Sequence, residues 1–532
     1  MATAVIVGSG PAAAGAALAL SSHSDIQITV LDLGVRLEPE RQHILDRLAI
    51  LQPQDWSDGD VRTVVGQPVE SSVRGLPEKR SYGSDFPFRD VGQLAGLTGS
   101  RDVNPSVISG AYGGFSNVWG AQLMPFAASV FDSWGISAHE LEGHYRSILE
   151  HLPFAAEHDD LANLFPLLGQ PNPLPDVSSR TQRVLNAYQR NRRRLNQLGI
   201  AIGKARLAVN SPACVRCARC MTGCPYSLIY SASQTFEELR RSDRVTYHDG
   251  LLALKVAEVG DKAVVTAKDR QTGQIHRFEA DRVYLACGAV GTTRIVANSL
   301  QLYDRDVTMQ ESQQFTVPML SLLPVPDPRL EPTFTLNQFN MIVAADDAGL
   351  DLSQVHFYTY NEAFVPALPR AFRHRLAEPV TAQLLRRLTV AIGYLPSWHS
   401  PVLRLRAKKA TSADELPDLT LSRDDPNWSR NTMLRTVLRR LLQAAPLVDL
   451  YPVLPKLVLS AGGKSYHWGG TFPHALDGRT MYSSDRVGRV GPWNRIHLVD
   501  AAVFPNVPAT THLLTVMANS HRIASESIQL QP

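Results

Sequence analysis

The N-terminal segment contains the feature that most constrains the fold, a glycine-rich turn between an apolar strand and an Ala/Leu-rich helix. Gly8-Ser9-Gly10-Pro11-Ala12-Ala13 matches G-x-G-x-x-G/A after apolar residues 4–7, and residues 26–31 alternate as a second strand that ends at Asp32. The pattern predicts a β-α-β unit whose turn approaches a pyrophosphate, with Ala13 small enough for close helix–strand packing. A carboxylate at Asp32 suits ribose hydroxyls and disfavours a 2′-phosphate, so FAD or NAD is favoured over NADP.

Composition allows a large core and excludes several functional classes. The chain has 532 residues, of which 44% are hydrophobic and 19% charged, so about three structural units are expected. Lys plus Arg number 53 and Asp plus Glu 50, a net charge of +3 that gives no reason to expect a nucleic-acid partner. No uncharged apolar run reaches the roughly 18 residues of a transmembrane segment. The chain begins with a strand pattern rather than a signal peptide, so we expect a cytoplasmic protein.

Four of the five cysteines lie within a single short run, at Cys214, Cys217, Cys220 and Cys224. With Pro225 they match C-x2-C-x2-C-x3-C-P, the spacing of bacterial ferredoxins, at every position. The run predicts an iron–sulfur cluster, either [4Fe–4S] held by all four thiolates or [3Fe–4S] held by three. The alternatives are a structural zinc site and a site without metal, although zinc ribbons usually use two separated pairs. Cys287 lies alone in an apolar strand and is predicted to be a buried core thiol.

Distant segments carry further motifs. One is the loop Gly113-Gly114-Phe115-Ser116-Asn117-Val118-Trp119-Gly120, and others are Ser465-Tyr466-His467-Trp468-Gly469-Gly470-Thr471 and residues 496–505 and 510–515. Together with the N-terminal turn and residues 288–295, they resemble the glucose–methanol–choline (GMC) family of FAD oxidoreductases. The motifs are most similar to pyranose oxidase and to the iron–sulfur-containing FAD sugar dehydrogenases.

The resemblance implies which residues hold FAD. Gly8, Gly10 and Asp32 would hold the ADP half. The loop residues that would line the flavin and pyrophosphate are Gly113, Gly114, Ser116, Asn117 and Trp119. Asp500 and Ala501 stand where the family's VD-x-x-x-FP segment contacts the cofactor. Some members tether flavin covalently through a His before this Trp, and because Val118 stands there, dissociable FAD is expected.

The resemblance also implies two catalytic residues. His467 stands at the position of the family's catalytic His, and a neutral imidazole beside the flavin can take the proton of an alcohol hydroxyl. The second family position, an Asn or His with a Thr three residues later, maps to His512 with Thr515, and Thr511 is a weaker substitute. Leu513 stands where a Pro often follows, which is a departure from the pattern.

We therefore expect an α/β fold, α+β overall, with a Rossmann-like FAD-binding domain built from discontinuous segments and a sheet-containing substrate domain. The FAD-binding parts are residues 1–130, with an excursion at about 35–105 that covers the site, then 205–304 with the iron–sulfur segment, and 459–532 with the catalytic His. The substrate or cap parts are residues 131–204 and 305–458.

The expected function is an FAD-dependent dehydrogenase that oxidises an alcohol or sugar hydroxyl by hydride transfer to flavin. Electrons would leave through the iron–sulfur cluster, which makes a redox partner protein conceivable. Two alternatives stay open. One is an oxidase of the same family that forms hydrogen peroxide and has a structural four-thiolate metal site. The other is a flavin and iron–sulfur electron-transfer subunit without a substrate of its own.

Other features favour structural roles. Residues 427–444 predict a basic amphipathic helix, which suits packing on its own domain better than a membrane surface. Two arginine groups are interpreted as solvated faces that could instead dock an acidic electron-transfer partner, namely Arg192-Arg193-Arg194 and Arg370, Arg373 and Arg375. His497 and His521 are predicted to be structural or surface residues.

Overall fold

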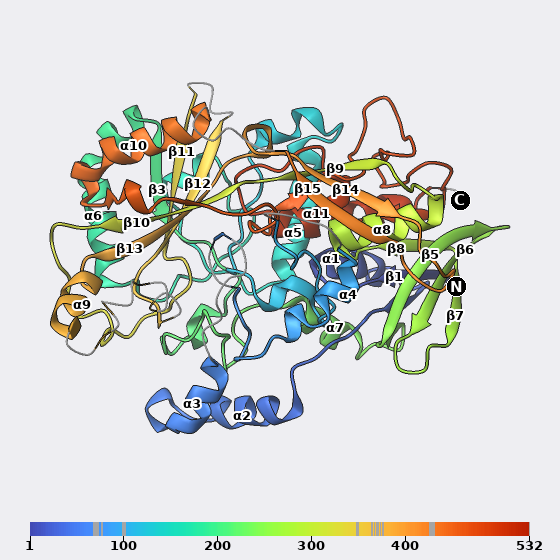
Figure 1. Cartoon of the computed structure of the whole chain (residues 1–532), viewed down its shortest axis with the longest axis horizontal. Coiled ribbons are helices and arrows are strands. Elements are labelled where there is room, and N and C mark those ends of the chain that lie inside the picture. The colour runs from blue at the N-terminus through green and yellow to red at the C-terminus, as the bar shows by residue number, and fades with distance from the viewer. Residues whose placement is uncertain are drawn as a thin grey trace.

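The computed structural model describes residues 1–66, 74–75, 78–97, 103–346, 351–362, 365, 368, 372, 374, 377–424 and 431–530. Arg370, Arg373 and Arg375 lie outside these residues. Within the described part of the chain, the strands form sheets of five, seven, four and three strands, and the two larger sheets lie at opposite ends of the molecule (Figure 1). No helix of this part is both long and apolar enough to pass through a bilayer.

The parallel sheet is assembled from three distant parts of the chain, in the order β19-β8-β1-β2-β4. Its strands are β1 (Ala2–Val7), β2 (Ile26–Leu31), β4 (Val245–His248), β8 (Arg282–Leu285) and β19 (Ile496–Leu498). The turn at Gly8 connects β1 to helix α1 (Pro11–Ser21), as the N-terminal motif predicts. The expectation of a Rossmann-like domain built from discontinuous segments is confirmed.

Helices α1 and α11 (Leu513–Ser527) pack closely beside the parallel sheet. Gly15 makes this approach possible, because a Cβ at that position would lie 2.4 Å from the carbonyl oxygen of Met517. Ala13 is fully buried on the same helix. The two ends of the chain consequently lie on the same side of the molecule (Figure 1).

The large antiparallel sheet supplies the expected second domain, in the order β16-β10-β13-β12-β11-β3 with β17 also paired to β10. Its strands are β3 (Ile200–Lys204), β10 (Gln314–Leu320), β11 (Phe339–Ala344), β12 (Leu352–Tyr358), β13 (Leu388–Tyr394), β16 (Tyr451–Pro452) and β17 (Val458–Leu459). Successive side chains of a strand point to opposite faces. Phe315, Val317 and Phe357 therefore pack under helices α6 (Ser179–Gln197) and α10 (Thr432–Val448), while the alternate residues face the interior of the molecule.

Two smaller sheets and further helices complete the fold. The strands are β5 (Leu251–Val259), β6 (Lys262–Asp269) and β7 (Ile275–Ala280) in one sheet, and β9 (Asp306–Glu311), β14 (Leu403–Lys408), β15 (Asp418–Arg423) and β18 (Trp468–Gly469) in the other. The remaining helices are α2 (Pro39–Ala49), α3 (Asp58–Val65), α4 (Val91–Ala95), α5 (Ala138–His151), α7 (Ala232–Leu239), α8 (Gly288–Leu300) and α9 (Glu378–Leu385).

The excursion at residues 35–105 contains helices that its sequence did not indicate. Helices α2 and α3 form a hairpin that projects from the body of the molecule (Figure 1). Only Leu45 and Leu48 of α2 are buried, so the helix has no apolar stripe long enough to reveal a helical period. The hairpin is attached near the cysteine run, where Trp56 stacks on Tyr226 with ring centroids 5.8 Å apart.

The basic amphipathic helix predicted at residues 427–444 is present and continues to Val448, while residues 427–430 lie outside the described residues. Within the described residues, α10 runs from Thr432 to Val448, and the side chain of Asn431 caps its N-terminus by accepting from the Leu434 N–H. Its apolar residues, including Val437 and Leu441, are buried against the large sheet. The helix thus packs on its own domain, as the sequence favoured.

Candidate active site

A cavity of about 530 Å³ lies between the parallel sheet and the interior face of the large antiparallel sheet. The Gly8 turn, Asp32 and part of the 113–120 loop line one end. His467, His512 and the interior residues of β12 and β13 line another part. The cavity therefore brings together motifs from both ends of the chain and from its middle.

The Gly8 turn is built for close backbone approach. Gly8 has φ +105°, and a Cβ there would lie 2.6 Å from the carbonyl oxygen of Ala286 at the end of β8. Gly10 stands at the N-cap of α1 with nothing near the position of a Cβ, so the first-turn N–H groups of α1 are open to a phosphate. Both glycines line the cavity, whereas Ala13 packs behind it.

Asp32 is buried at the end of β2, at the same end of the cavity. Its Oδ2 accepts from the Ser9 hydroxyl at 2.5 Å and from the Tyr247 hydroxyl at 2.8 Å. Burial raises the pKa of Asp32 to about 6, although these hydrogen bonds act in the opposite direction. Ser9 also accepts from the Gly113 N–H at 3.0 Å, which joins the Gly8 turn directly to the second motif.

The 113–120 loop is held mainly by its own polar side chains. Asn117 donates to the carbonyl oxygens of Tyr112 and Gly114 at 2.9 and 2.8 Å, and Ser116 donates to Gly113 at 2.5 Å. The Trp119 indole donates to the Tyr230 carbonyl at 2.8 Å. Gly114, Ser116 and Trp119 line the cavity, whereas Gly113 and Asn117 shape the loop from outside it.

The Asp500–Ala501 segment lies opposite this loop in the cavity wall. Asp500 accepts from the Thr292 hydroxyl at 2.5 Å and from the Ala502 N–H at 2.9 Å, and burial raises its pKa to about 6. Cys287 differs from its prediction as a core thiol. It is only half-buried and lines the cavity, because β8 ends there, and its thiol donates to the Val7 carbonyl at 3.4 Å.

His467 and His512 lie together in the cavity wall, with ring centroids 4.9 Å apart in an edge-to-face arrangement. His467 follows Tyr466, which has φ +58°, and its backbone N–H donates to the Ser465 hydroxyl at 3.1 Å. Ser465 in turn donates to buried Glu311 at 2.8 Å. His512 is the N-cap residue of α11. Separate elements thus bring both predicted imidazoles to one place.

Burial determines the protonation of this pair. Burial holds the pKa of His467 well below its ordinary range, and repulsion from the neighbouring His512 and His356 acts in the same direction. Burial lowers the pKa of His512 to about 4. Neither Nδ1 atom has a hydrogen-bond partner among the described residues. Both rings are therefore neutral at pH 7 and free to bond a small molecule.

A third imidazole in the cavity was missed from the sequence. His356 on β12 is 4% exposed, its Nε2 has no partner among the described residues, and burial lowers its pKa to about 3. Its ring and that of His467 both contact Tyr394, at 5.2 and 4.5 Å between centroids. The Tyr394 hydroxyl accepts from Gln314 at 3.1 Å. The sequence signal that could have revealed His356 is the alternation of polar and apolar residues along the buried strand β12.

Backbone N–H groups point at all four sulfurs of the cysteine loop. The donors are Arg216 to Cys214, Arg219 to Cys217, Thr335 to Cys220 at 3.4 Å, and both Tyr226 and Leu228 to Cys224. Arg216 and Ala218 have φ +55° and +59°. Such left-handed residues turn successive N–H groups toward a common anion and are found around iron–sulfur sites. The donor set therefore fits thiolates that carry negative charge.

The four thiols lie near one another without forming a site for a single ion. Burial raises the pKa of Cys217 to about 12 and that of Cys224 to about 11, and repulsion from the other thiolates acts in the same direction. Yet among the described residues no three His, Cys, Asp or Glu side chains are arranged to hold a metal ion. The described geometry thus supports neither the predicted iron–sulfur cluster nor the structural zinc alternative.

The cysteine loop adjoins the cavity. Ala218, Arg219, Met221 and Thr222 line it between the cysteines. Lys79 also lines it and donates to the Trp119 carbonyl at 2.8 Å. Burial lowers the pKa of Lys79 to about 8, and the nearby Cys220 thiolate opposes that shift. A cationic side chain therefore lies beside both the 113–120 loop and the cysteine loop.

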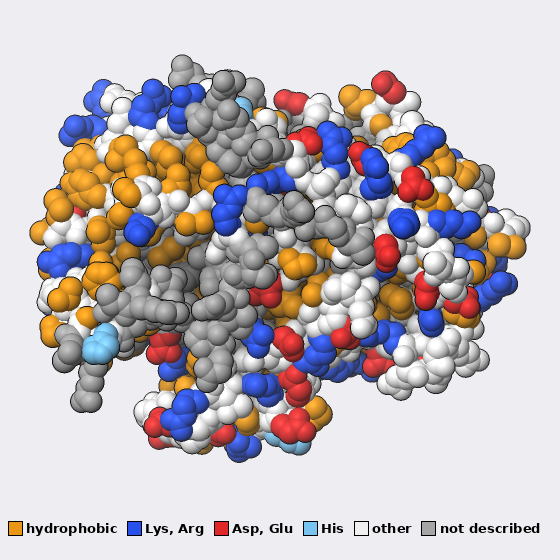
Figure 2. All heavy atoms as spheres, viewed as in Figure 1, with side chains coloured by type: hydrophobic (Ala, Val, Ile, Leu, Met, Phe, Trp, Pro, Cys, Tyr) orange, Lys and Arg blue, Asp and Glu red, His pale blue; other side chains and the backbone are white. Residues whose placement is uncertain are grey.

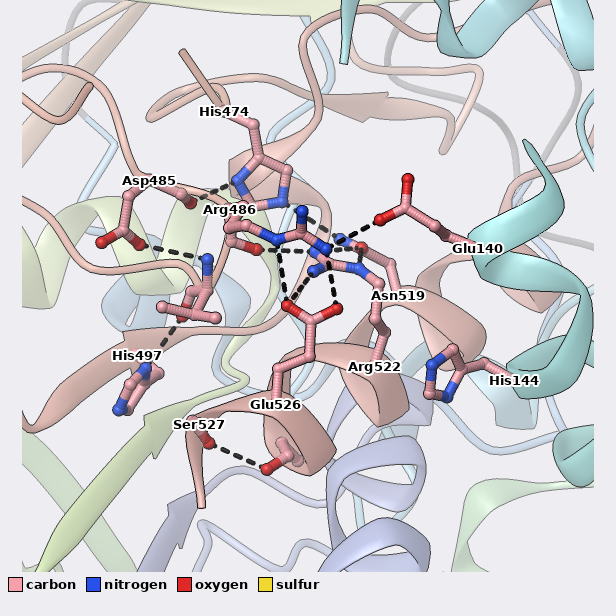
Figure 3. Close-up of polar contacts among 12 residues, drawn as sticks. Glu140, His144, His474, Asp485, Arg486, His497, Asn519, Arg522, Glu526 and Ser527 are labelled. Atoms are coloured by element: carbon pink, nitrogen blue, oxygen red, sulfur yellow. Dashed lines mark hydrogen bonds and ion pairs between the residues drawn. The ribbon is translucent and has the colours of Figure 1, made fainter. Parts of the chain in front are cut away.

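A polar network behind the cavity connects the segments that carry the two predicted catalytic histidines (Figure 3). His474, seven residues after His467, contacts Asn519 of α11 at 3.4 Å. Fully buried Arg522 donates to Asn519 and to the Arg486 carbonyl, and Arg486 reaches α5. His497 and His521 belong to this region, where His497 bonds the Val487 carbonyl and His521 bonds His144. These contacts agree with structural roles for both.

Comparison with known proteins gives matches to solved structures only, since neither a protein-family model nor a curated protein matches the chain. Pyridoxine 4-oxidase from Mesorbium loti superposes with a TM-score of 0.61 at 15% identity, covering 100% of both chains. Formate oxidase from Aspergillus oryzae RIB40 gives 0.60 at 13% identity, over 99% of this chain and 98% of the other. An FAD-dependent oxidoreductase from Chaetomium thermophilum gives 0.59 at 13%, over 99% of both. The chain has the fold of these proteins throughout its length.

Proposed function

We propose that this chain is an FAD-dependent oxidoreductase of the GMC family that oxidises an alcohol or sugar hydroxyl. One observation carries the proposal: two neutral, unpartnered imidazoles lie on the same cavity as the dinucleotide-type turn. The fold shared with proteins named as FAD-dependent or as oxidases supports it. The GMC motifs at both ends of the chain support it independently of the fold.

The described residues fit FAD. The open N-terminus of α1 suits the pyrophosphate, and Asp32, which already accepts hydrogen bonds from two hydroxyls, suits the ribose. Gly114, Ser116, Trp119 and Ala501 line the same cavity as the histidines and would contact the cofactor. When bound, FAD supplies the acceptor for a hydride from the carbon that bears the hydroxyl.

The two imidazoles would handle the hydroxyl group. An alcohol becomes a carbonyl when its O–H proton and its C–H hydride leave, and His467, held neutral by burial, takes the proton. His512 bonds the same oxygen from the side and holds it against His467, since the two rings meet edge to face. Tyr394 keeps the His467 ring in place by stacking on it at 4.5 Å.

The cysteine loop would hold a [4Fe–4S] cluster. The ferredoxin-like spacing of the four cysteines and the N–H donors to their sulfurs support this proposal. Bound there, the cluster supplies one-electron transfer to an acceptor outside the protein. The loop residues that line the cavity support a site next to the proposed flavin.

The cofactors are tested on anaerobically purified protein by its absorption spectrum and by assays of iron and acid-labile sulfide. The proposal expects flavin bands with about four irons and four sulfides per chain. Cys220→Ser is expected to lose iron and keep flavin. Flavin without iron in the wild-type chain would refute electron transfer through an iron–sulfur cluster. It would leave the oxidase alternative, which is favoured by two structural neighbours that are named as oxidases. That alternative forms one hydrogen peroxide per substrate oxidised.

The catalytic base is tested by anaerobic mixing of substrate with the flavin-loaded protein. His467→Ala is expected to keep FAD yet slow substrate-driven flavin reduction by at least about 100-fold. His497→Asn is the matched control, because His497 is also an imidazole whose pKa is lowered by burial but lies outside the cavity. Equal rates for His467→Ala and wild type would show that the base is another residue.

A further inference from the structure

Helices α6 and α10 form an outer layer of unusual charge. Their sequences contain nine arginines and no Asp or Glu. Both helices bury their apolar residues against the same face of the large antiparallel sheet, which leaves most of the arginines pointing outward. Arg190, Arg193 and Arg194 on α6 and Arg435 and Arg439 on α10 are exposed.

These five arginines have no carboxylate to neutralise them within the described part of the chain. Their neighbour Arg192 pairs with Asp160 at 2.5 Å, but no ion pair involves any of the five. Elsewhere, exposed arginines such as Arg404 and Arg406 are each paired with an aspartate. The outer layer formed by α6 and α10 thus carries positive charge that forms no ion pair within the described part of the chain.

Exposed aliphatic side chains lie at one end of the two helices. Leu322 and Leu323 are 69% and 62% exposed, in a loop whose N–H groups donate to Asp449 at the end of α10. Arg180 and Arg183 of α6 donate to the Leu323 and Pro324 carbonyls, which fixes the loop where the two helices meet. Leu442 on the outer side of α10 is 46% exposed.

We call this surface the α6–α10 face: Arg190, Arg193, Arg194, Arg435, Arg439, Leu322, Leu323 and Leu442. Figure 2 shows hydrophobic side chains gathered over this end of the molecule, with Lys and Arg along their margin. Exposed apolar side chains gathered on one surface mark an interaction site on a protein. The face lies on the side of the large sheet away from the cavity, so its occupation leaves the proposed active site open.

We propose that the α6–α10 face binds the surface of an anionic lipid bilayer. A guanidinium bonds phosphate in a bidentate fork, and basic side chains beside an apolar loop match a layer of phosphates above acyl chains. The surface of an acidic protein would pair with the arginines but would not explain the exposed leucines. Leu322 and Leu323 point to lipid, because they are the most exposed apolar residues of the face and aliphatic side chains are uncommon anchors in protein interfaces. The proposal does not depend on the reaction catalysed.

The test is co-sedimentation of the full-length protein with vesicles of phosphatidylcholine alone or with 30% phosphatidylserine, at about 50 and 300 mM salt. Binding is expected only to the anionic vesicles, and weaker at the higher salt because screening shortens the reach of the charges. Arg190→Gln/Arg193→Gln/Arg194→Gln should weaken binding about 100-fold, at about fivefold per charge. Leu322→Ser/Leu323→Ser should weaken it about tenfold without changing net charge.

The control is Arg277→Gln/Arg404→Gln/Arg406→Gln, which removes the same charge from other surfaces. It should bind vesicles within about twofold of wild type. Each variant is compared by its thermal midpoint and flavin content, which report folding independently of lipid. Absence of wild-type binding at low salt would overturn the proposal and leave an acidic protein as the occupant. Equal losses in the control and the α6 variant would also overturn it, because binding would then follow net charge alone.

Discussion

Three imidazoles, those of His356, His467 and His512, line the cavity, and each has a ring nitrogen that no described residue bonds. Burial lowers the pKa of each ring, so all three are neutral near pH 7. A wall of neutral imidazoles and Tyr394 offers hydrogen bonds and an aromatic surface around His467. Such a wall suits an uncharged hydroxylated substrate.

His356→Leu is expected to raise the KM of the proposed substrate about tenfold, because one hydrogen bond to the buried substrate is lost. The kcat should stay within about threefold, since His467 and His512 are untouched. His356→Gln, which keeps a polar atom, should recover part of the affinity. Steady-state kinetics of the three proteins check this. An unchanged KM for His356→Leu would remove His356 from the substrate site.

The pH dependence of flavin reduction should follow the lowered pKa of the histidines. A base acts when unprotonated, so the activity is present above its folded-state pKa and is lost as pH falls through that value. With His512 at about 4 and His467 well below 6.5, the rate should stay nearly constant from pH 8 to 5.5. Rapid mixing into buffers of different pH measures the rate before the protein unfolds. A half-loss near pH 6.5 would contradict the assignment.

At the scale of elements, the contact of α1 with α11 determines how the nucleotide end connects to the proposed active site. α11 begins at His512 and passes over α1, where Gly15 meets the Met517 backbone. A Cβ at Gly15 would overlap backbone atoms that have no rotamer by which to move. Separation of the two helices would therefore displace His512 as well.

Gly15→Ala should destabilise the protein by about 2–3 kcal/mol, as overpacking in a tight core does, and lower its affinity for FAD. Gly143→Ala is the control, because Gly143 lies in helix α5 and no atom comes within 4 Å of the position that a Cβ would take there. That change should stabilise the protein by about 0.5–1 kcal/mol. Thermal and denaturant unfolding measure both. Similar effects of the two substitutions would show that the α1–α11 spacing is not tight.

Local patterns predicted some elements well and others poorly. The β1–α1–β2 unit was predictable because its strand, turn and helix are consecutive and strongly patterned. α2 was not, since only Leu45 and Leu48 of it are buried. The histidines at 467 and 512 were found through motifs, whereas His356 follows no motif. Its place in the cavity depends on which face of the large sheet meets the parallel sheet, and that is a property of tertiary packing.

Across the whole molecule, buried titratable groups link stability to pH. Burial lowers the pKa of His356 and His474 to about 3 and that of His497 and His512 to about 4, against 6.5 in an unfolded chain. These imidazoles take up protons on unfolding below pH 6.5. Asp32 and Asp500, whose pKa is raised to about 6, have the opposite effect between pH 6 and 4, but the imidazoles outnumber them.

Stability should therefore decrease as pH falls from 6.5 toward 4, with each excess proton contributing about 1.4 kcal/mol per pH unit. The measurement is the thermal midpoint at pH 7, 6 and 5, together with the protons taken up on unfolding at pH 5. We expect net uptake and a falling midpoint. Net release of protons at pH 5 would mean that the carboxyls, not the imidazoles, dominate the acid response.

The strand order of the parallel sheet has a consequence for biosynthesis. β19 and α11 come from the last part of the chain, yet β19 pairs with β8 beside β1, and α11 covers α1. A ribosome-bound chain therefore holds its first β-α-β unit uncovered until almost all codons have been read. If the chain binds flavin as proposed, the cofactor would be loaded only after β19 and α11 have been synthesised.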